Sequence, residues 1–467
     1  MLVKNHTRRL HLIPVIVIEA LGGIAGPENV TTDEAALAAY AYDATRRKGA
    51  PGVVVRPGSE SEVSAIMRLA TERKMPVVPR GAGSGLSGGA VASRGGIALS
   101  FERMAAITEV DTANRIAILQ PGVVTGTLQK AVERVGLFYP PDPGSLAFCT
   151  IGGNVAENAG GMRALKYGVT RDYVIGLRAV LPSGEAIKAG VRTAKGVVGY
   201  DLTRLIVGSE GTLAVITEIT LRLVPRPEKV VTMTACFSDP SQAGRAVAAI
   251  MASTVTPRCL EFLDSEALGA GARLSGAKVP EGAGAFLLIE TDGSSEEATR
   301  QAGVIRSLIE KDALSFSVAS DPGEAAALWK LRRSTSQALF TLAPDKINED
   351  VVVPVSKVPD ALAGFEEIAV RRGLKIVCFG HAGDGNIHVN VMTDLSDPKR
   401  REDAEAAVGE VFSLVIRLGG TISGEHGIGL SKAPYLRMEL SDVEIELMKR
   451  VKAAFDPLGI MNPGKIF

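Results

Sequence analysis

The chain has 467 residues, with 52 basic and 52 acidic side chains and 46% apolar residues. This length exceeds what one hydrophobic core usually serves, so we expect two or more domains. The apolar content excludes wholesale disorder. The zero net charge gives no electrostatic reason to expect nucleic acid or an anionic membrane as the main partner.

The four cysteines, Cys149, Cys236, Cys259 and Cys378, are too far apart to form a C-x-x-C pair. This spacing argues against a zinc ribbon, a ferredoxin-type iron–sulfur cluster and a disulfide scaffold. Scattered thiols fit a reducing compartment, and the sequence contains no apolar run of about 18 residues that would predict a membrane span. We therefore predict a cytoplasmic protein, with attachment to the inner membrane through a partner as the alternative.

The N-terminus loosely resembles a signal or transit peptide, because Lys4, Arg8 and Arg9 precede the apolar stretch 12–26. Glu19 interrupts that stretch, and its second half reads as the start of a helix. We predict a short extension rather than an export signal.

The first regular unit begins with the apolar segment 53–57, which predicts a buried strand. A capping box follows at Ser59 and Glu62, and apolar residues then recur at helical spacing up to Ala70. Residues 75–79 predict a second strand, so this region is expected to form a β-α-β unit.

The elements expected next are strands and one helix around a long loop. The helix, 126–136, should carry Leu128, Val132 and Val135 on one face. Residues 140–170 are rich in glycine, proline and asparagine, and so long a loop is usually functional. The strands are expected at 97–101, 115–122, 174–185 and 212–225.

A charged, proline-containing linker at 225–229 precedes a second region of strands and helices. Strands are expected at 230–237, 286–290 and 375–392, and helices up to about 252 and over 296–310, 322–340 and 400–418. A motif loop at 423–430 and a last helix follow. The predicted fold class is α+β. The predicted division is an extension and helix (1–44), a first domain (45–226), a cap domain (227–420) and a tail that returns to the first domain (421–467).

Residues 80–89 form a glycine loop, with glycine at five of its ten positions. Glycine lets the backbone approach a ligand closely, and successive free amides form a nest for an anion such as a phosphate or pyrophosphate. Gly83, Gly85 and Gly88 also fit the G-x-G-x-x-G fingerprint, with Glu102 as the ribose-binding acid. We reject that interpretation, because the next strand follows too soon for the crossover helix that a Rossmann unit needs.

Three of the five histidines occur in two glycine-flanked motifs: His381 and His388 in one, and His426 next to Glu425 in the other. Two histidines and a carboxylate are a common ligand set for a divalent metal with open positions. His426 is then a candidate general base. This constellation alone does not distinguish a hydrolase from an oxidoreductase.

Six motifs occur in a fixed order along the chain. They are PVVPRGAGSGLSGGA, PPDPGSLAFCTIGGNVAENAGG, VGSEGTLAVITEITLRLVP, GHAGDGNIHVN, GEHGIGLSK and FDPLGIMNPGKIF. With them, the chain from about residue 17 resembles the FAD-linked 2-hydroxy-acid dehydrogenases of the vanillyl-alcohol oxidase superfamily, of the glycolate oxidase and D-lactate dehydrogenase type. The resemblance implies a two-part FAD-binding domain of vanillyl-alcohol oxidase type plus an α+β cap domain for the substrate.

The resemblance also implies the FAD-binding residues. The pyrophosphate loop would be Arg80, Gly81, Ala82, Gly83, Ser84, Gly85, Leu86, Ser87, Gly88 and Gly89. The other contacts would be Pro143, Gly144, Ser145, Gly152, Gly153, Asn154, Glu210, Gly211, Thr212, Ile216 and, from the tail, Asn462. Because the sequence has no histidine between His11 and His381, we expect FAD to be bound without a covalent histidine link.

By the same resemblance, His381, His388 and Glu425 would bind a divalent metal, zinc or manganese. The metal would polarise the substrate as a Lewis acid. His426 would take the hydroxyl proton while the α-hydrogen leaves as hydride to flavin N5. Arg332 would hold the substrate carboxylate, and Asn390 would help to position the substrate.

The expected substrate is a small D-2-hydroxy acid, D-lactate or glycolate, which becomes the 2-oxo acid. Relatives that act on 2-hydroxyglutarate carry a lysine just before a D-x-x-x-P strand. Here Lys346 is offset, and Glu349 would repel a second carboxylate. The alternatives are a D-2-hydroxyglutarate dehydrogenase or another flavoprotein of the superfamily, a subunit that binds FAD without catalysis, and a metallohydrolase without flavin.

The chain shows no haem or iron–sulfur motif that could relay electrons internally. We therefore expect an external acceptor other than NAD: a quinone, a cytochrome, an electron-transferring flavoprotein or an iron–sulfur subunit. A homodimer is compatible with the sequence.

Overall fold

The computed structural model describes residues 13–467, so the predicted basic extension at Lys4, Arg8 and Arg9 lies outside the described residues. The first helix, α1 (Val15–Ala25), buries Val17, Leu21 and Ala25. It covers the second half of the apolar stretch, as expected, but begins four residues before Glu19, earlier than predicted. Among residues 13–467, none of the helices is both long enough and apolar enough to cross a membrane.

A four-stranded sheet, in the order β1-β2-β4-β3, opens the N-terminal part of the molecule. Its strands β2 (Val53–Val55), β4 (Ile97–Ser100) and β3 (Val77–Arg80) are parallel, and β1 (Val30–Thr31) pairs antiparallel with β2. Helix α3 (Glu60–Glu72) crosses between β2 and β3, as the β-α-β pattern predicts.

The start of α3 uses the two residues of the predicted capping box. The Ser59 hydroxyl accepts a hydrogen bond from the Glu62 amide at 3.2 Å. The Glu62 carboxylate accepts from the amide of Gly58, at 2.8 Å, one residue before the helix cap.

The second sheet is antiparallel, in the order β5-β6-β10-β8-β9. Each of the two long strands predicted in this region is divided into two shorter ones. The strand predicted over 174–185 ends as β8, and β9 follows it as a paired strand. The strand predicted over 212–225 is divided into β10 and β11, and β11 pairs with β7. The bounds are β5 (Ile107–Asp111), β6 (Ile116–Leu119), β7 (Leu137–Phe138), β8 (Val174–Val180), β9 (Ala186–Gly190), β10 (Val215–Arg222) and β11 (Val224–Pro225).

The helix predicted over 126–136 is α4 (Thr125–Glu133), and it ends three residues earlier than expected. Val135 lies beyond the end of this helix and does not share the buried face of Leu128 and Val132, since its side chain is 49% exposed. Gly136 has a φ of +74°, so the chain has already left the helix there and the periodicity no longer reports its buried face.

The predicted loop 140–170 contains two short helices, α5 (Ile151–Glu157) and α6 (Ala164–Tyr167). Helix α5 begins Ile-Gly-Gly, a weak local signal for a helix. Close packing explains the glycine at position 152, because a Cβ there would lie 2.5 Å from the Pro121 side chain. The short helix α7 (Leu202–Ile206) then precedes β10.

The second half of the chain forms a seven-stranded antiparallel sheet, in the order β15-β12-β14-β13-β17-β18-β16. The single strand predicted over 375–392 is a hairpin, because the Ala-Gly-Asp-Gly segment 382–385 forms a turn with Gly385 at a φ of +82°. The bounds are β12 (Lys229–Phe237), β13 (Cys259–Asp264), β14 (Ala285–Gly293), β15 (Ser315–Val318), β16 (Asp345–Val352), β17 (Lys375–His381) and β18 (Asn386–Thr393).

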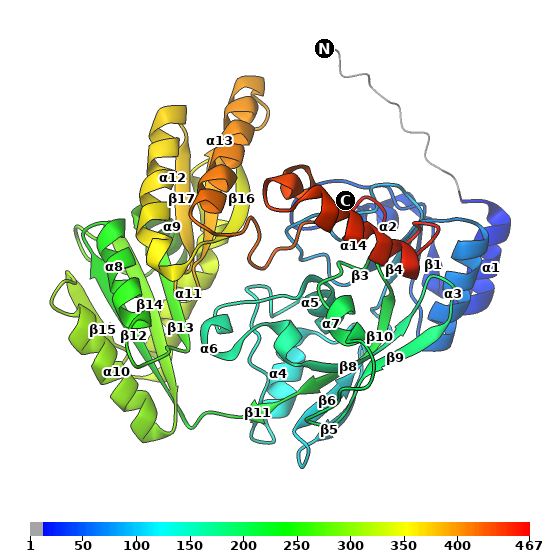
Figure 1. The fold of residues 1–467 in the computed structure, drawn as a ribbon, viewed down its shortest axis with the longest axis horizontal. Coiled ribbons are helices and arrows are strands. Elements are labelled where there is room, and N and C mark those ends of the chain that lie inside the picture. The colour runs from blue at the N-terminus through cyan, green and yellow to red at the C-terminus, as the bar shows by residue number, and fades with distance from the viewer. Residues whose placement is uncertain (1–12) are drawn as a thin grey trace.

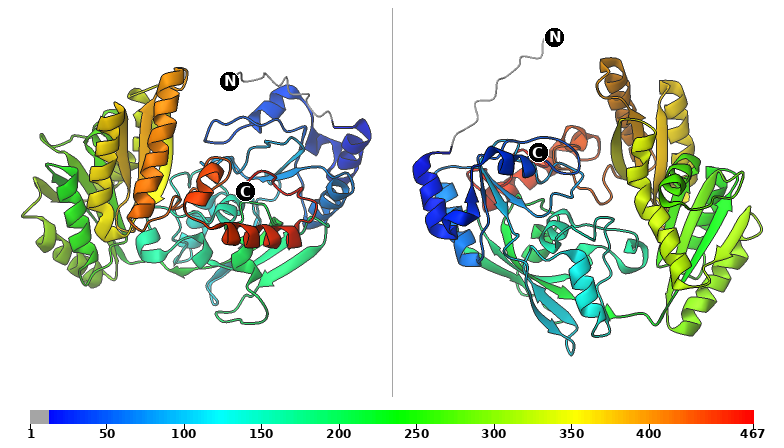
Figure 2. Two further views of the ribbon diagram at one scale, coloured as in Figure 1. Left: turned by 45° about the horizontal axis from the view of Figure 1, so that its top comes forward. Right: turned by 180° about the vertical axis from the view of Figure 1, so that it is seen from behind.

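Helices cover both faces of this sheet (Figures 1 and 2). One face packs on α8 (Pro240–Met251), α10 (Ser295–Ile309), α12 (Val358–Arg372) and α13 (Pro398–Arg417), through residues such as Val247, Phe365 and Phe412. The other face packs on α9 (Ser265–Ser275) and α11 (Pro322–Ala338), which meet Leu263 and Phe379.

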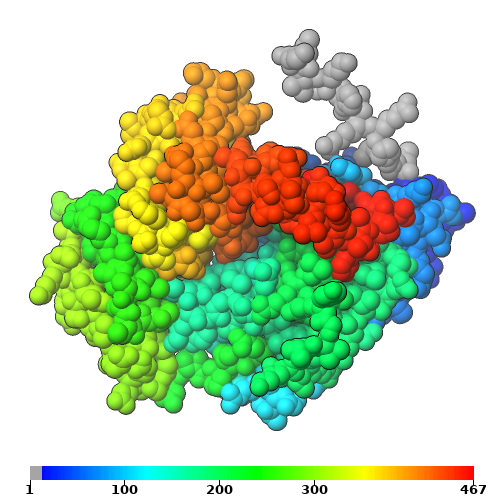
Figure 3. Space-filling model, in the orientation of Figure 1, coloured from blue at the N-terminus to red at the C-terminus, as the bar shows by residue number. Residues whose placement is uncertain are grey.

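The tail, residues 421–467, runs from the seven-stranded sheet to the N-terminal part and carries α14 (Asp442–Phe455). On the face seen in Figure 3 it lies across both parts. Its end joins β3, where the Val77 amide donates to the Ile460 carbonyl at 2.9 Å and the Asn462 amide donates to the Val77 carbonyl at 2.8 Å. The tail therefore ties the two halves of the molecule together.

Candidate active site

A cavity of about 450 Å³ lies where the glycine loop, α11, the 375–392 hairpin and the tail meet. Most of the predicted site residues line it. They are Arg80, Gly81, Ala82, Gly83, Ser84, Gly85, Leu86, Gly89, Pro143, Gly144, Ser145, Gly152, Gly153, Asn154, Glu210, Gly211, Ile216, Arg332, His381, His388, Glu425 and His426. Ser87, Gly88, Thr212, Asn390 and Asn462 are predicted site residues that do not line this cavity.

Ser87 and Gly88 face the tail instead of the cavity. The Ser87 carbonyl accepts hydrogen bonds from the amides of Leu430 and Ser431, at 2.8 and 3.1 Å. Gly88 has a φ of +86°, and a Cβ there would lie 3.0 Å from the Leu430 side chain. Their role in the structure is to hold the glycine loop against the motif loop.

Asn462 and Thr212 also brace the wall from behind. The Asn462 amide group donates to the carbonyls of Gly89 and Glu210, at 2.9 and 2.7 Å. The Thr212 hydroxyl donates to the Ser209 carbonyl at 2.7 Å. The reach of Asn462 back to the N-terminal part is as predicted, but its side chain binds protein backbone and does not line the cavity.

Glu210 forms part of the cavity wall and also binds the motif loop. Its carboxylate accepts from the amides of Ile428 and Gly429, at 2.8 and 2.7 Å. Glu157, which the sequence analysis missed, lines the same region. Burial and the neighbouring Glu210 carboxylate raise the pKa of Glu157 well above its ordinary value.

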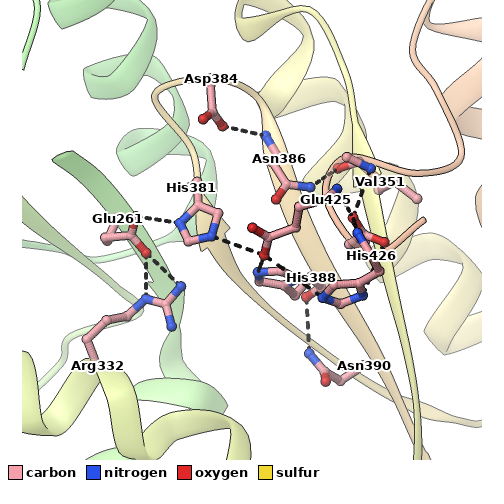
Figure 4. A network of polar contacts seen from close by, with 12 residues as sticks. Glu261, Arg332, Val351, His381, Asp384, Asn386, His388, Asn390, Glu425 and His426 are labelled. Atoms are coloured by element: carbon pink, nitrogen blue, oxygen red, sulfur yellow. Dashed lines mark hydrogen bonds and ion pairs between the residues drawn. The ribbon is translucent and has the colours of Figure 1, made fainter. Parts of the chain in front are cut away.

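His381 ends β17 and His388 lies in the paired strand β18, so the hairpin places both side chains beside Glu425 of the motif loop (Figure 4). The Glu425 Oε1 atom lies 3.5 Å from Nε2 of each histidine. One possible ligand atom from each of these three residues lies within 4.8 Å of the others. This donor set fits a divalent metal.

The protonation of the cluster follows from burial and its charges. Burial opposes a charged His381, but the Glu261 and Glu425 carboxylates raise its pKa well above the ordinary value. Burial, together with the neighbouring histidines, lowers the pKa of His388 well below its ordinary value. Although burial acts in the opposite direction, the histidines lower the pKa of Glu425 to about 2. The cluster thus combines an ionised carboxylate with a neutral imidazole.

His426 stacks on His388, with ring centroids 5.3 Å apart. Its Nδ1 lies 3.2 Å from Oδ1 of Asp350, a fully buried carboxylate on β16. Burial lowers the pKa of His426 despite this neighbour. Asp350 also accepts from the amides of Gly424, Glu425 and His426, at 2.8, 2.6 and 3.1 Å, and pairs with Lys432.

Arg332 lies on α11, and its guanidinium forms an ion pair with Glu261 of β13 at 2.6 Å. Glu261 is fully buried, and the sequence analysis missed it. Asp350 is the first residue of the D-x-x-x-P pattern, so the sequence already contained a signal that pointed to it. For Glu261, the one available signal was a charged residue inside the apolar run Cys259–Asp264.

The predicted repulsion by Glu349 is wrong, because successive side chains of β16 point to opposite faces. Asn348 lines the cavity, whereas Glu349 turns towards Lys432, with a closest distance of 3.8 Å. Lys346 donates to the carbonyl and hydroxyl of Ser336, both at 2.7 Å. Glu349 therefore gives no reason to exclude a substrate with a second carboxylate.

Asn390 is fully buried, and its amide donates to the carbonyls of Val377 and His388, both at 3.1 Å. It follows His388 by two residues on β18, so both side chains lie on the same face of the strand. The contact of Asn390 with substrate stays a prediction.

A glycine loop suited to a phosphate, facing an acid–base cluster across one cavity, defines an enzyme that holds a phosphate-bearing cofactor next to its reacting groups. Residues 51–190 match the family described as FAD binding domain, and residues 226–466 match FAD linked oxidases, C-terminal domain. The chain belongs to the FAD-linked oxidases.

Two relatives are similar along almost their whole length. Glycolate oxidase subunit GlcD of Bacillus subtilis is 46% identical, over 97% of this chain and 96% of that protein. A D-lactate dehydrogenase of Anaerostipes hadrus is 38% identical, over 90% of each chain. The predicted family and enzyme class are confirmed: this is an FAD-linked oxidoreductase.

Among solved structures, p-cresol methylhydroxylase has a TM-score of 0.79 at 17% identity, covering 97% of this chain and 96% of that chain. At this identity the match shows the fold alone. It confirms the predicted α+β fold of vanillyl-alcohol oxidase type.

The contact between the glycine loop and the motif loop gives a first testable prediction. Gly429 has a φ of +49°, and a Cβ there would lie 2.2 Å from the Ser87 carbonyl oxygen. Gly429→Ala must push residue 87 away and so displace the amides of the glycine loop, at a cost of about 1–3 kcal/mol. We expect the affinity for FAD, measured by fluorescence titration of the apoprotein, to fall about 10-fold or more.

Gly459→Ala is the matched control. Gly459 also has a positive φ, +65°, but among residues 13–467 no atom outside its chain neighbours lies within 4 Å of a Cβ placed there. This variant carries only the backbone cost of about 1 kcal/mol and should bind FAD like the wild type. An equal loss of affinity in both variants would contradict the proposed role of the loop contact.

Proposed function

We propose that this protein is an FAD-dependent dehydrogenase that oxidises a small D-2-hydroxy acid, D-lactate or glycolate, to the 2-oxo acid. The observation that supports this most strongly is the single cavity shared by the glycine loop, Arg332 and the histidine cluster. The relatives named for glycolate and D-lactate support the same class of substrate.

FAD would be held without a covalent histidine link by the first domain, residues 45–226. The described residues fit it, because the backbone of residues 80–86, rich in glycine, lines the cavity together with Arg80, Gly152 and Gly153. Bound FAD supplies a two-electron acceptor for the hydride of the substrate.

His381, His388 and Glu425 would hold a divalent metal, zinc or manganese. The fit rests on the spacing of their donor atoms and on His381, whose Nδ1 faces Glu261 at 2.6 Å and leaves Nε2 directed towards Glu425. Such an ion supplies Lewis-acid polarisation of the substrate hydroxyl.

The side chains of the cap, residues 227–420, and of the tail, residues 421–467, would bind the acid and move its proton. Arg332 binds the substrate carboxylate through the guanidinium edge that Glu261 leaves unoccupied. His426 takes the hydroxyl proton on Nε2, since its Nδ1 faces the Asp350 carboxylate. Asp350 holds the ring in place and stabilises the imidazolium that forms, as a buried carboxylate does for the histidine of a serine protease.

The electrons would leave to an external acceptor: a quinone, a cytochrome, an electron-transferring flavoprotein or an iron–sulfur subunit. The Bacillus subtilis relative is named a subunit, which supports a protein partner. We place the enzyme in the cytoplasm, or at the inner membrane through that partner, and the homodimer stays a prediction.

An anaerobic visible spectrum tests the function directly. We expect a yellow protein whose flavin bands bleach on addition of D-lactate or glycolate, with L-lactate as the stereochemical control. D-2-hydroxyglutarate is added in parallel, because the Glu349 argument against it failed. Removal of the metal with a chelator should slow bleaching about 100-fold or more, and added Zn²⁺ or Mn²⁺ should restore it.

Each other outcome points to a different alternative. A yellow protein that none of these acids bleaches would contradict the hydroxy-acid proposal while leaving the FAD site intact. A protein that stays colourless after reconstitution with FAD would contradict the proposed cofactor and favour the metallohydrolase. Full activity after complete metal removal would contradict the metal site.

A further inference from the structure

We infer that Glu261 is a positioning residue that couples the substrate-carboxylate clamp to the metal site. The inference deepens the proposed function and rests on its metal site and on the role of Arg332. It is carried by one buried carboxylate that contacts both groups at once.

Glu261 lies on β13, next to β17 in the seven-stranded sheet, and is completely buried. Its Oε1 lies 2.6 Å from Nδ1 of His381. Its Oε2 accepts from the guanidinium of Arg332, at 2.7 Å from Nε and 2.6 Å from Nη2. Figure 4 shows the carboxylate between the two side chains, which approach it from different elements.

The contact with His381 decides which ring nitrogen carries the proton. A carboxylate only accepts hydrogen bonds, so the His381 proton sits on Nδ1. Nε2 is then the ring atom that can give up its proton to bind a cation, and it lies 3.5 Å from the Glu425 carboxylate. A carboxylate behind a ligating histidine both orients the ring and increases its basicity as a ligand.

The contact with Arg332 decides which edge of the guanidinium faces the cavity. Nε and Nη2 are occupied by Glu261, so Nη1 is the nitrogen left for a ligand. Arg332 is 4% exposed, and its guanidinium lies over the Phe379 ring, 4.9 Å from the centroid. The arginine is therefore held in one orientation before substrate arrives, which reduces the entropic cost of binding.

One negative charge thus serves two functional groups. If Glu261 becomes glutamine, its amide nitrogen can donate to His381 Nδ1, which moves the ring proton to Nε2 and blocks the metal-binding atom. The amide oxygen still accepts from Arg332 but no longer neutralises it. We expect the metal to bind more weakly in this variant. Because the guanidinium is no longer neutralised, we expect a carboxylate ligand to bind more tightly.

The test measures both affinities on the FAD-loaded protein. The chelator-treated holoenzyme is titrated calorimetrically with Zn²⁺, and the metal-free protein is titrated with oxalate, a non-oxidisable carboxylate probe for Arg332. For Glu261→Gln we expect the Zn²⁺ affinity to fall about 10- to 100-fold and the oxalate affinity to rise about 10-fold.

Glu290→Gln is the matched control, because Glu290 is a buried carboxylate on the adjacent strand β14 and pairs with Arg258 at 3.3 Å. This variant should keep both affinities. Glu261→Asp keeps the charge but is shorter, so it can serve one partner only. It should change only one of the two affinities, and it replaces Glu261→Gln in the test if that variant does not fold.

The results separate the inference from the proposed function. Tight Zn²⁺ and oxalate binding that is unchanged in both Glu261 variants would overturn the coupling while leaving the metal site in place. A wild-type protein that binds no Zn²⁺ would overturn the proposed metal site and the inference with it. Equal changes of both affinities in Glu261→Gln and Glu290→Gln would show a general effect of removing buried charge and would also overturn the inference.

Discussion

Replacement of His426 by asparagine is expected to slow flavin reduction by the substrate about 10²- to 10⁴-fold, while FAD stays bound. A positioned general base typically contributes an acceleration of this size. The His426 side chain is 10% exposed, and its Nδ1 faces Asp350 at 3.2 Å, so Nε2 is the atom available to a proton in the cavity. Asparagine is polar and similar in size but is not a base at neutral pH. Anaerobic stopped-flow absorbance of the flavin bands measures the rate.

Ser423→Ala provides the control from the same loop. The Ser423 hydroxyl donates to the Gly427 carbonyl at 3.0 Å, so its removal loosens the loop without touching the histidine. We expect this variant to reduce its flavin within a few-fold of the wild-type rate. A His426→Asn enzyme that bleaches as fast as the wild type would show that another group takes the proton.

Replacement of Asp350 by asparagine is expected to lower the free energy of unfolding by about 3–5 kcal/mol and to abolish activity. Removing one member of a buried ion pair leaves the other charge uncompensated, here that of Lys432, whose side chain is 3% exposed. The carboxylate also orders three successive amides of the motif loop, from Gly424 to His426. Urea unfolding, followed by circular dichroism, measures the loss of stability.

The pH dependence of this loss follows from the direction of the pKa shift. Burial would raise the pKa of Asp350, but His426, Lys432 and the loop amides outweigh it and hold the pKa well below its ordinary value. A carboxyl group whose pKa is lower in the folded state stabilises the fold fully above its unfolded pKa of about 3.9, and this contribution disappears in acid. The difference between wild type and Asp350→Asn should therefore be large at pH 7 and shrink below about pH 4.

Asp345→Asn, on the same strand, is the control. Asp345 is half-buried and accepts from the Leu395 amide at 3.0 Å, so its replacement should cost only about 1 kcal/mol. If both variants lost the same stability at every pH, the charge of Asp350 would not be the cause.

The local signals in the sequence were sufficient for the elements that build the cofactor side of the cavity. Periodic apolar residues and a capping pair predicted α3, and the run of glycines predicted the loop after β3, which lines the cavity. Such patterns report backbone conformation and the chemistry of nearby side chains within one segment. They failed at Val135 and in the 375–392 hairpin, where a glycine at positive φ ends the regular element.

The ordered motifs also identified the family and brought His381, His388, Glu425 and His426 into one predicted site, and the structure places all four around one cavity. The sequence by itself therefore determined the class of enzyme and the side chains that meet at the cavity. These are properties that short, contiguous motifs carry.

Only the tertiary structure decided which groups control those side chains. Glu261 reaches His381 across 120 residues of chain, and Asp350 reaches the amides of the motif loop across 74 to 76 residues. It also decided that Asn462 braces the wall from behind and that Glu349 faces away from the cavity. The physical reason is that strand pairing and strand alternation choose the neighbours and direction of each buried polar group, and no local pattern records which distant strand will lie beside it.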